Sequence, residues 1–229
     1  MKYKNPFRYL TPFEWCLWLF SLAVIAVSSL LSNGSVLSMV ASLIGVTALI
    51  FVAKGMVVGQ FLIVIFATLY GILSIFNQYY GEMITYLFMS APIAICSIVS
   101  WLKNPFEDSH EVKVHRMTRR EVGVMVGLCA VLTVAFFFLL RALGNASLWV
   151  STLSMATSFV AAYMTWKRSP FYALGYALND VVLIVLWVVA TVRVPDNFPM
   201  IMCFSVFLIQ DTYGFISWRR MERRQRAGK

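Results

Sequence analysis

Residues 121–140 read EVGVMVGLCAVLTVAFFFLL, in which nineteen uncharged residues follow a single glutamate. An α-helix needs about 20 mostly apolar residues to cross the hydrocarbon core of a bilayer. A scan of the 229-residue chain with that length finds eight such segments. They are 14–31, 36–53, 58–77, 83–102, 121–140, 147–166, 170–191 and 198–218. We therefore predict an all-α integral membrane protein with about eight transmembrane helices.

The composition agrees with a protein that is solvated largely by lipid. Hydrophobic residues make up 60% of the chain and charged residues 13%, whereas a soluble domain carries about 25% charged residues. The four cysteines are scattered singly in apolar runs, so neither a zinc site nor a disulfide framework is expected. Both histidines lie in the charged segment 103–120, and the chain has no Gly-rich ATP-binding loop. We therefore expect no enzymatic activity, no cofactor and no metal.

The basic residues predict the orientation of the helices. An even number of spans places both termini on one side of the membrane, and 17 of the 19 Lys and Arg residues then fall in segments on that side. Arg141 and Arg193 are the two in the outer loops. Because positive charge is retained in the cytoplasm during insertion, both termini and the 103–120 segment are expected to be cytoplasmic. The net charge of +9 is thus a topology signal, and we expect membrane lipids as its partners, with no nucleic acid.

Two helix ends share a sequence pattern. The fourth segment closes with Ser100-Trp101-Leu102-Lys103 and the eighth with Ser217-Trp218-Arg219. Counting back from each Trp gives three helices, which predicts two parallel triplets separated by a linker helix; two unrelated interfacial anchors are the alternative. The predicted organisation is an N-terminal extra helix (1–35), a first triplet (36–102), a basic loop with the linker helix (103–146), a second triplet (147–218) and a basic tail (219–229).

Polar residues at mid-membrane depth are the candidates for a binding site, because ionisable groups in the hydrocarbon are costly and usually line a pathway. Asn179 and Asp180 lie at the midpoint of the seventh segment. At 100° per residue they share a helix face with Tyr172, Tyr176 and Trp187, whose rings flank an amide and a carboxylate. The other candidates are Gln210, Asp211 and Tyr213 in the last segment and Gln60 and Tyr70 in the third. For Asp180, a purely structural contact to a neighbouring helix is the alternative.

Several spaced motifs carry a resemblance to a known family. They are Lys54-Gly-Met-Val-Val-Gly59, Leu69-Tyr70-Gly71, Tyr80-Gly81-Glu82, Pro92, Trp101-Leu-Lys-Asn104 and Tyr213-Gly214-Phe-Ile-Ser-Trp218-Arg. Across about residues 40–220 the chain resembles the bacterial PnuC family of nicotinamide riboside transporters. The resemblance implies a 3+1+3 helix core like that of the SWEET sugar transporters, the bacterial cytoplasmic membrane, and facilitated diffusion of a vitamin precursor. It also matches Asn179 and Asp180 with the polar pair that the family places at its substrate.

We therefore predict a facilitative carrier that binds nicotinamide riboside between the two triplets. The expected roles are hydrogen bonding by Asn179 and Asp180, aromatic contact by Tyr176 and Trp187, and closure from the last helix by Gln210 and Asp211. A carrier of another nucleoside or vitamin is the first alternative. The second is a non-transporting membrane sensor or scaffold that uses the 103–120 loop or the basic tail. The chain could also form a homo-oligomer.

Overall fold

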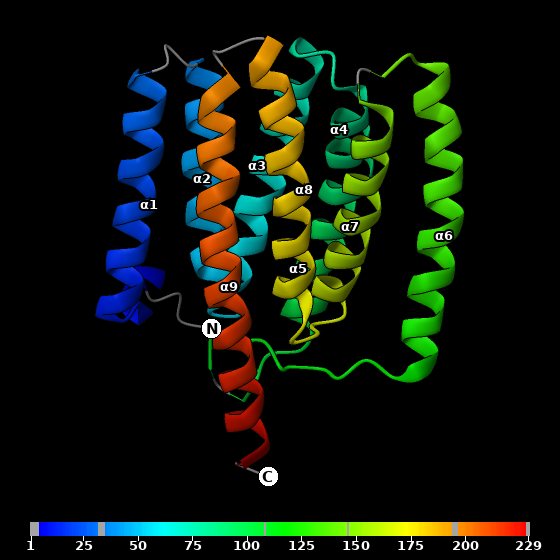
Figure 1. Cartoon of the computed structure of the whole chain (residues 1–229). Coiled ribbons are helices and arrows are strands. Elements are labelled where there is room, and N and C mark those ends of the chain that lie inside the picture. The colour runs from blue at the N-terminus through cyan, green and yellow to red at the C-terminus, as the bar shows by residue number, and fades with distance from the viewer. Residues whose placement is uncertain (1–4, 32–34, 108, 146, 194–196, 228–229) are drawn as a thin grey trace.

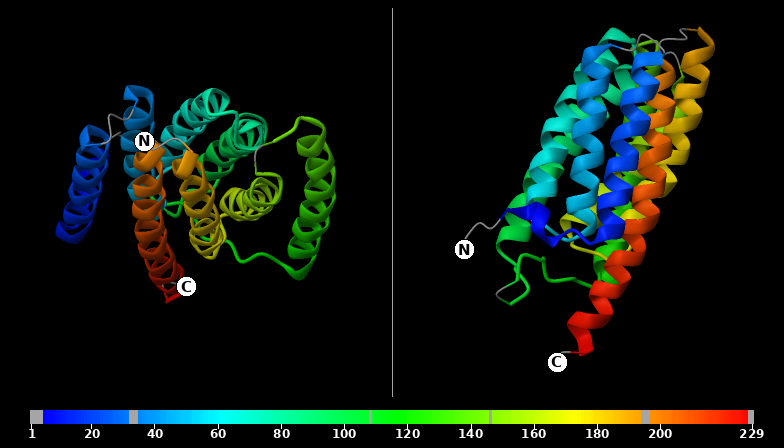
Figure 2. Two further views of the ribbon diagram at one scale, coloured as in Figure 1. Left: turned by 45° about the horizontal axis from the view of Figure 1, so that its top comes forward. Right: turned by 90° about the vertical axis from the view of Figure 1, so that its left-hand side faces the viewer.

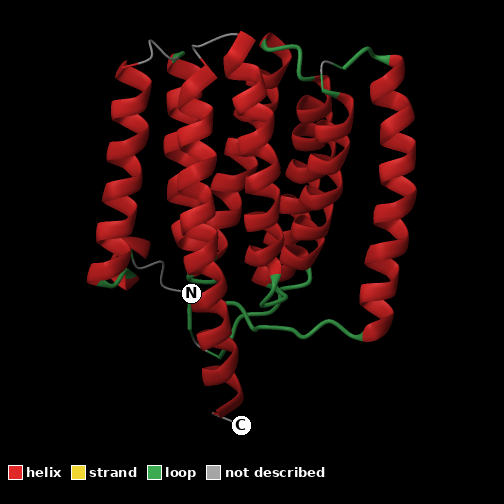
Figure 3. Ribbon diagram, viewed as in Figure 1, coloured by secondary structure: helices red, strands yellow, loops and turns green. Residues whose placement is uncertain are grey.

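The computed structural model describes residues 5–31, 35–107, 109–145, 147–193 and 197–227. Long helices stand side by side in it (Figure 1), and Figure 3 shows helices and loops throughout the described residues. A short 3-10 helix, Pro6–Tyr9, comes first. The other elements are α1 (Pro12–Leu31), α2 (Val36–Ala53), α3 (Val57–Phe76), α4 (Tyr80–Ile84), the π-helical segment η2 (Thr85–Ser90), α5 (Ala91–Leu102), α6 (Arg119–Ala142), α7 (Leu148–Trp166), α8 (Tyr172–Arg193) and α9 (Phe198–Ala227).

Seven spans within the described residues are long and apolar enough to cross a membrane, and α4, η2 and α5 together form one of them. The predicted all-α membrane fold is thereby confirmed. α7 stands among these spans (Figure 1) but is less apolar than they are, because it carries six Ser and Thr residues. On the outside, large apolar side chains such as Val131 and Phe138 of α6 are exposed, which suits a surface that faces lipid.

Two helix ends differ from the sequence prediction by more than two residues. The fourth span begins at Tyr80 and not at residue 83, so that Glu82 lies inside the helix. α9 runs past the predicted end at residue 218 to Ala227. Beyond the apolar part, Glu222 forms ion pairs with Arg219 and Arg226 on the neighbouring turns. Pairs at these spacings stabilise a helix that has left the apolar environment.

Pro92 is accommodated by a local change of helix type. A proline in a helix interior removes one N–H donor and crowds the carbonyl four residues earlier. Directly before it, Thr85–Ser90 forms a π-helical turn, in which the Ala91 N–H bonds the Tyr86 carbonyl five residues back. This wider turn takes up the mismatch, so the span stays continuous from Tyr80 to Leu102. Such turns are frequent at functional sites.

The two Ser-Trp pairs make matching contacts at one end of the bundle. Trp101 donates its indole N–H to the Thr165 carbonyl oxygen near the end of α7, over 3.0 Å. Trp218 donates its own to the Val52 carbonyl oxygen near the end of α2, over 2.9 Å. The two indole ring centroids lie 5.5 Å apart. The preceding serines repeat the pattern. The Ser100 hydroxyl donates to the Trp166 carbonyl oxygen, and the Ser217 hydroxyl donates to the Ala53 carbonyl oxygen.

The loop between α5 and α6 lies across this same end, beside the last turns of α9 (Figures 1 and 2). The Val112 N–H donates to the Gly55 carbonyl after α2, and the His115 N–H donates to the Arg168 carbonyl after α7, each over 3.0 Å. Gly55 and Arg168 both adopt a left-handed backbone, with φ of 65° and 57°. From α9, the Gln225 side chain accepts a hydrogen bond from the Val114 N–H and donates one to the Val112 carbonyl oxygen. The loop therefore ties α2, α7 and α9 together at this end.

The arrangement of the helices leaves a well-packed centre. Figure 2 shows α1 and α6 at opposite edges of the bundle, with the other long helices between them. The largest apolar cluster lies among the inner helices and includes Tyr70, Trp187, Phe204 and Phe207. The side chains that meet in this centre come mainly from α2, α3, η2, α8 and α9.

Candidate functional site

α8 presents one polar and aromatic face to the inside of the bundle. Asn179 and Asp180 are each 2% exposed, and Tyr172, Leu183 and Trp187 on the same face are buried. The opposite face carries exposed apolar residues, Leu174, Leu178, Val181 and Val185. The helical periodicity thus predicted correctly which side of α8 turns inward. α8 carries half of the ten candidate residues.

Asn179 is held from α7. Its side-chain oxygen accepts hydrogen bonds from the hydroxyls of Thr157, at 2.8 Å, and Ser158, at 2.9 Å. Because two donors converge on this oxygen, the amide plane is fixed and its NH₂ group is oriented away from α7. The NH₂ group is then the part of Asn179 that can donate to a ligand.

Asp180 and Asp211 form a pair of buried carboxyl groups. Their side chains interact directly between α8 and α9, and they are 2% and 3% exposed. One Asp180 oxygen, Oδ2, has no hydrogen-bond partner among the described residues. Neither carboxyl group forms an ion pair with a described basic residue. A buried carboxyl pair without a cation is costly unless another group satisfies it.

Trp187 and Tyr70 lie together in the half of the bundle away from the Ser-Trp pairs. The Trp187 indole N–H donates to the Tyr70 hydroxyl oxygen over 2.8 Å. Tyr86 packs against Tyr70 with ring centroids 4.3 Å apart, and Tyr79 packs against Trp187 at 5.5 Å. Four aromatic rings therefore pack together here, about two turns along α8 from Asn179 and Asp180.

Tyr172 and Tyr176 lie toward the opposite end of α8, beside the Ser-Trp pairs. The Tyr172 ring packs against Trp218 at 4.8 Å and against Tyr176 at 6.2 Å. The hydroxyls of both tyrosines interact electrostatically with the Asp211 carboxyl group. Gln60, near the start of α3, is also buried in this half of the bundle.

Two candidates from α9 face away from the centre. Gln210 donates a hydrogen bond to the Ser21 hydroxyl of α1 over 2.9 Å. Tyr213 donates to the Glu14 carboxylate of α1 over 2.6 Å, and Glu14 also pairs with Lys54 at 3.2 Å. The structure therefore places Gln210 and Tyr213 between α9 and α1, apart from the cluster that contains Asp180 and Asp211.

Glu82 and Tyr86 are buried residues that the sequence reasoning missed as site candidates. Glu82 is fully buried, and the Ser154 hydroxyl of α7 donates to its Oε2 atom over 3.3 Å. The signal was present, because Glu82 stands directly before the apolar run that was taken to start at residue 83. The serines and threonines of α7, at spacings of three and four, were a second signal of a polar inward face.

Gly81 explains how α4 approaches α7 closely enough for this contact. A Cβ atom at Gly81 would lie 2.8 Å from the Cβ atom of Ser151, so only glycine fits without a shift. The Gly81 N–H also donates to the Asn145 side chain, over 3.2 Å, and Asn145 bonds the Ser151 hydroxyl. This close packing brings the Glu82 side chain into contact with Ser154 of α7.

Carboxyl groups, an oriented amide and several aromatic rings thus meet at the centre of helices that are built to cross a membrane. This combination defines a multi-pass helical membrane protein with an internal polar site, the arrangement that carriers of small polar molecules use.

Comparison with known proteins places the chain more narrowly. The family model described as "Nicotinamide mononucleotide transporter" matches residues 35–220. The chain belongs to this family.

Its relatives agree with that assignment. The chain is 27% identical to the nicotinamide riboside transporter PnuC of Neisseria mucosa, over 93% of this chain and 83% of the relative. It is 23% identical to the protein of the same name from Haemophilus influenzae, over 82% of this chain and 81% of the relative. Among solved structures, the crystal structure of the vitamin B3 transporter PnuC matches with a TM-score of 0.82 and 25% identity, over 94% of both chains.

Proposed function

We propose that this protein is a facilitative carrier of nicotinamide riboside and binds it at the central cluster around Asn179, Asp180 and Asp211. The observation that carries the proposal is the buried carboxyl pair with its unpartnered oxygen. Nicotinamide riboside is a cationic pyridinium with ribose hydroxyls. It would supply both the positive charge and the hydrogen-bond donors that this pair lacks. A membrane potential of about 100 mV, negative inside, would favour its entry by about 2.3 kcal/mol.

The charges favour the riboside over the mononucleotide that appears in the family description. A mononucleotide carries a phosphate group, which proteins bind with Arg, Lys or helix N-termini. No Lys, Arg or His occurs in the apolar parts of the spans, where the carboxyl groups lie. A phosphate at this depth would meet Asp180 and Asp211 with no cation to offset it.

Each candidate residue has a place in this proposal. Asn179 and Asp180 hydrogen-bond the ligand, Trp187 and Tyr70 offer aromatic surface on one side, and Tyr176 does so on the other. Asp211 completes the site from α9. Tyr172 and Gln60 lie in the half of the bundle that contains the Ser-Trp pairs, and Gln210 and Tyr213 hold α9 against α1.

We further propose that the two triplets are structural repeats in a 3+1+3 core. In support, Trp101 of the first triplet binds the end of α7, which opens the second, and Trp218 of the second binds the end of α2, which opens the first. A two-fold relation between the triplets would produce this exchange of contacts. The left-handed turns at Gly55 and Arg168, each bound by the same loop, follow the same relation.

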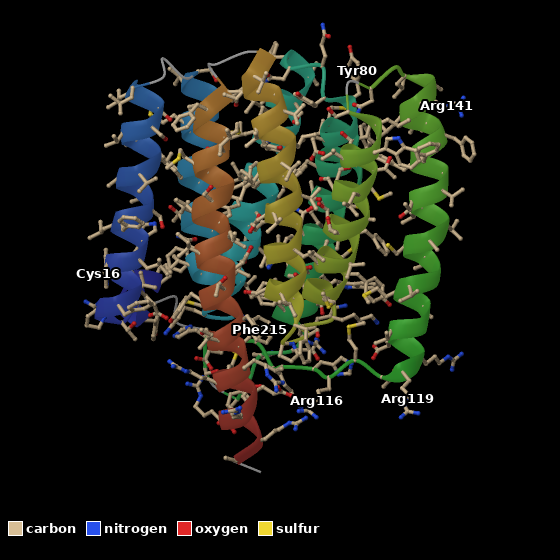
Figure 4. The ribbon with its side chains drawn as sticks, viewed as in Figure 1. Cys16, Tyr80, Arg116, Arg119, Arg141 and Phe215 are labelled. Carbon is tan, nitrogen blue, oxygen red and sulfur yellow. The ribbon has the colours of Figure 1, made fainter. Side chains whose placement is uncertain are left out.

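We propose that the end with both termini and the α5–α6 loop is cytoplasmic. Figure 4 shows Arg116 and Arg119 at this end and Arg141 at the opposite one. Cysteine accessibility in intact cells tests the orientation, in a variant whose four native cysteines are alanine. An impermeant reagent should label Arg141→Cys and spare Lys113→Cys, both of which are exposed positions. The reverse pattern would contradict the proposed orientation.

A binding screen on purified protein tests the proposed substrate. We expect saturable binding of nicotinamide riboside by isothermal titration, and binding of the mononucleotide at least about tenfold weaker, because its phosphate meets uncompensated carboxylates. Tighter binding of another nucleoside or vitamin would favour the first alternative, a carrier with a different substrate. If folded protein bound none of them, a sensor or scaffold that uses the α5–α6 loop would be favoured.

A further inference from the structure

Glu82 is a third buried carboxyl group, separate from the Asp180–Asp211 pair. It lies on the first turn of α4, at the end of the bundle away from the Ser-Trp pairs, and is 0% exposed. Its Oε2 atom accepts one hydrogen bond from Ser154, and its Oε1 atom has no partner among the described residues. One weak hydroxyl contact does not satisfy a carboxylate, which can accept about four hydrogen bonds.

No positive charge compensates Glu82 within the part of the chain that the structure describes. None of the ion pairs there involves it. The apolar parts of the spans contain no Lys, Arg or His at all. Removing a carboxylate from water without a partner is strongly unfavourable, so Glu82 must be neutralised either by a proton or by a cation that approaches it.

The neighbours of Glu82 suit an organic cation. The hydroxyls of Tyr70 and Tyr86 both interact electrostatically with its carboxyl group, and their ring centroids lie 4.3 Å apart. Trp187 joins these two tyrosines through the hydrogen bond that its indole N–H donates to Tyr70. Aromatic rings attract a cation through their electron-rich faces, most strongly when water is excluded. A flat cationic ring would thus meet aromatic surface and a carboxylate at the same place.

Tyr86 connects this group to the main site. Its hydroxyl is close enough to both Glu82 and Asp180 to interact electrostatically with each carboxyl group. A ligand with a cationic ring and a hydroxyl-bearing sugar has one feature for each of them. The ring would lie toward Glu82 and the sugar toward Asn179 and Asp180.

We infer that Glu82 is a specificity-determining residue that recognises the fixed positive charge of the ligand's pyridinium ring. The inference rests on the proposed function and adds the orientation of the substrate. It assigns charge recognition to α4 and recognition of the ribose to α8. An uncharged ligand of the same shape would use the ribose contacts and gain nothing from Glu82.

The test compares two ligands that differ in this charge. Nicotinamide riboside is the cation, and its reduced dihydropyridine form is uncharged and keeps the ribose and the carboxamide. Both are titrated into the purified wild type, Glu82→Gln and Glu121→Gln, a matched carboxyl-to-amide change at the start of α6. We expect the wild type to prefer the cation by about tenfold or more, since a desolvated cation gains at least that much beside aromatic faces and a carboxylate. Glu82→Gln should abolish the preference by weakening the binding of the cation alone, whereas Glu121→Gln should keep it.

The possible failures can be told apart. If the wild type binds neither ligand, the proposed function fails, and the inference fails with it. If the wild type binds both but shows no preference, or if Glu82→Gln weakens both by the same factor, only the role of Glu82 is overturned. If Glu82→Gln does not fold, Glu82→Asp decides. Shortening the side chain by one methylene group moves the carboxylate away from the cation and should reduce the preference for it. If Glu82 had only a packing role, the affinities for both ligands would change by the same factor.

Discussion

Replacing Asp180 by asparagine is expected to weaken the binding of nicotinamide riboside by about tenfold to a hundredfold. The change keeps the shape of the side chain and removes its charge, along with an acceptor oxygen that has no partner among the described residues. Hydrogen bonds to charged groups contribute about 1.5–3 kcal/mol, which corresponds to this range. Isothermal titration of the purified variant measures the dissociation constant.

A matched carboxyl-to-amide change provides the control. Glu121 lies at the start of α6, where it caps the helix and pairs with Lys167 at 3.2 Å, far from the central cluster. Glu121→Gln should leave the dissociation constant unchanged. If folded Asp180→Asn also keeps wild-type affinity and shows a lower melting temperature, then Asp180 holds helices together and does not bind the ligand.

Replacing Trp218 by alanine is expected to destabilise the protein by about 3–5 kcal/mol. Trp218 is fully buried, packs against Trp101 and Tyr172, and donates a hydrogen bond to Val52. Truncating a buried aromatic residue leaves a cavity, and here it also removes one of the donors to the Val52 carbonyl, which keeps its bond from the Gly55 N–H. Reversible denaturation in detergent or bicelles measures the change in the free energy of unfolding.

Two further variants show what kind of contact is lost. Trp149 of α7 is 74% exposed, so Trp149→Ala should change stability by less than about 0.5 kcal/mol. Trp101→Ala should cost about as much as Trp218→Ala if the two triplets are equivalent repeats. A large effect at Trp218 with a small one at Trp101 would speak against equivalence. Equal, small effects at Trp218 and Trp149 would contradict the structural role of the pair.

The helices were predictable because the bilayer imposes a length on each of them. The prediction was weaker where that constraint ends. α9 leaves the apolar region at Trp218 and is continued by the ion pairs of Glu222, which hydropathy cannot detect. At the start of α4, a glutamate looked like a boundary residue, yet Glu82 is buried beside Ser154. A charge at a helix end marks a boundary only when it faces water.

The site was predictable along α8 and not between helices. A period of 3.6 residues determined that Tyr176, Asn179 and Asp180 share a face. Which residues meet that face depends on contacts between distant parts of the chain, such as Trp187 with Tyr70. The same geometry explains Gln210, because adjacent residues on a helix point about 100° apart. With Asp211 toward α8, Gln210 points to Ser21 of α1.

Counterflow in liposomes is the measurement that tests the proposed carrier most directly. Purified protein is reconstituted into vesicles loaded with unlabelled nicotinamide riboside and diluted into labelled riboside, without ATP and without any ion gradient. We predict transient accumulation of label inside the vesicles, because exchange of the riboside needs no other driving force. Asp180→Asn should accumulate much less label, because it binds the riboside more weakly. Absence of exchange in vesicles that contain folded protein, or exchange that requires a sodium or proton gradient, would contradict facilitated diffusion through this site.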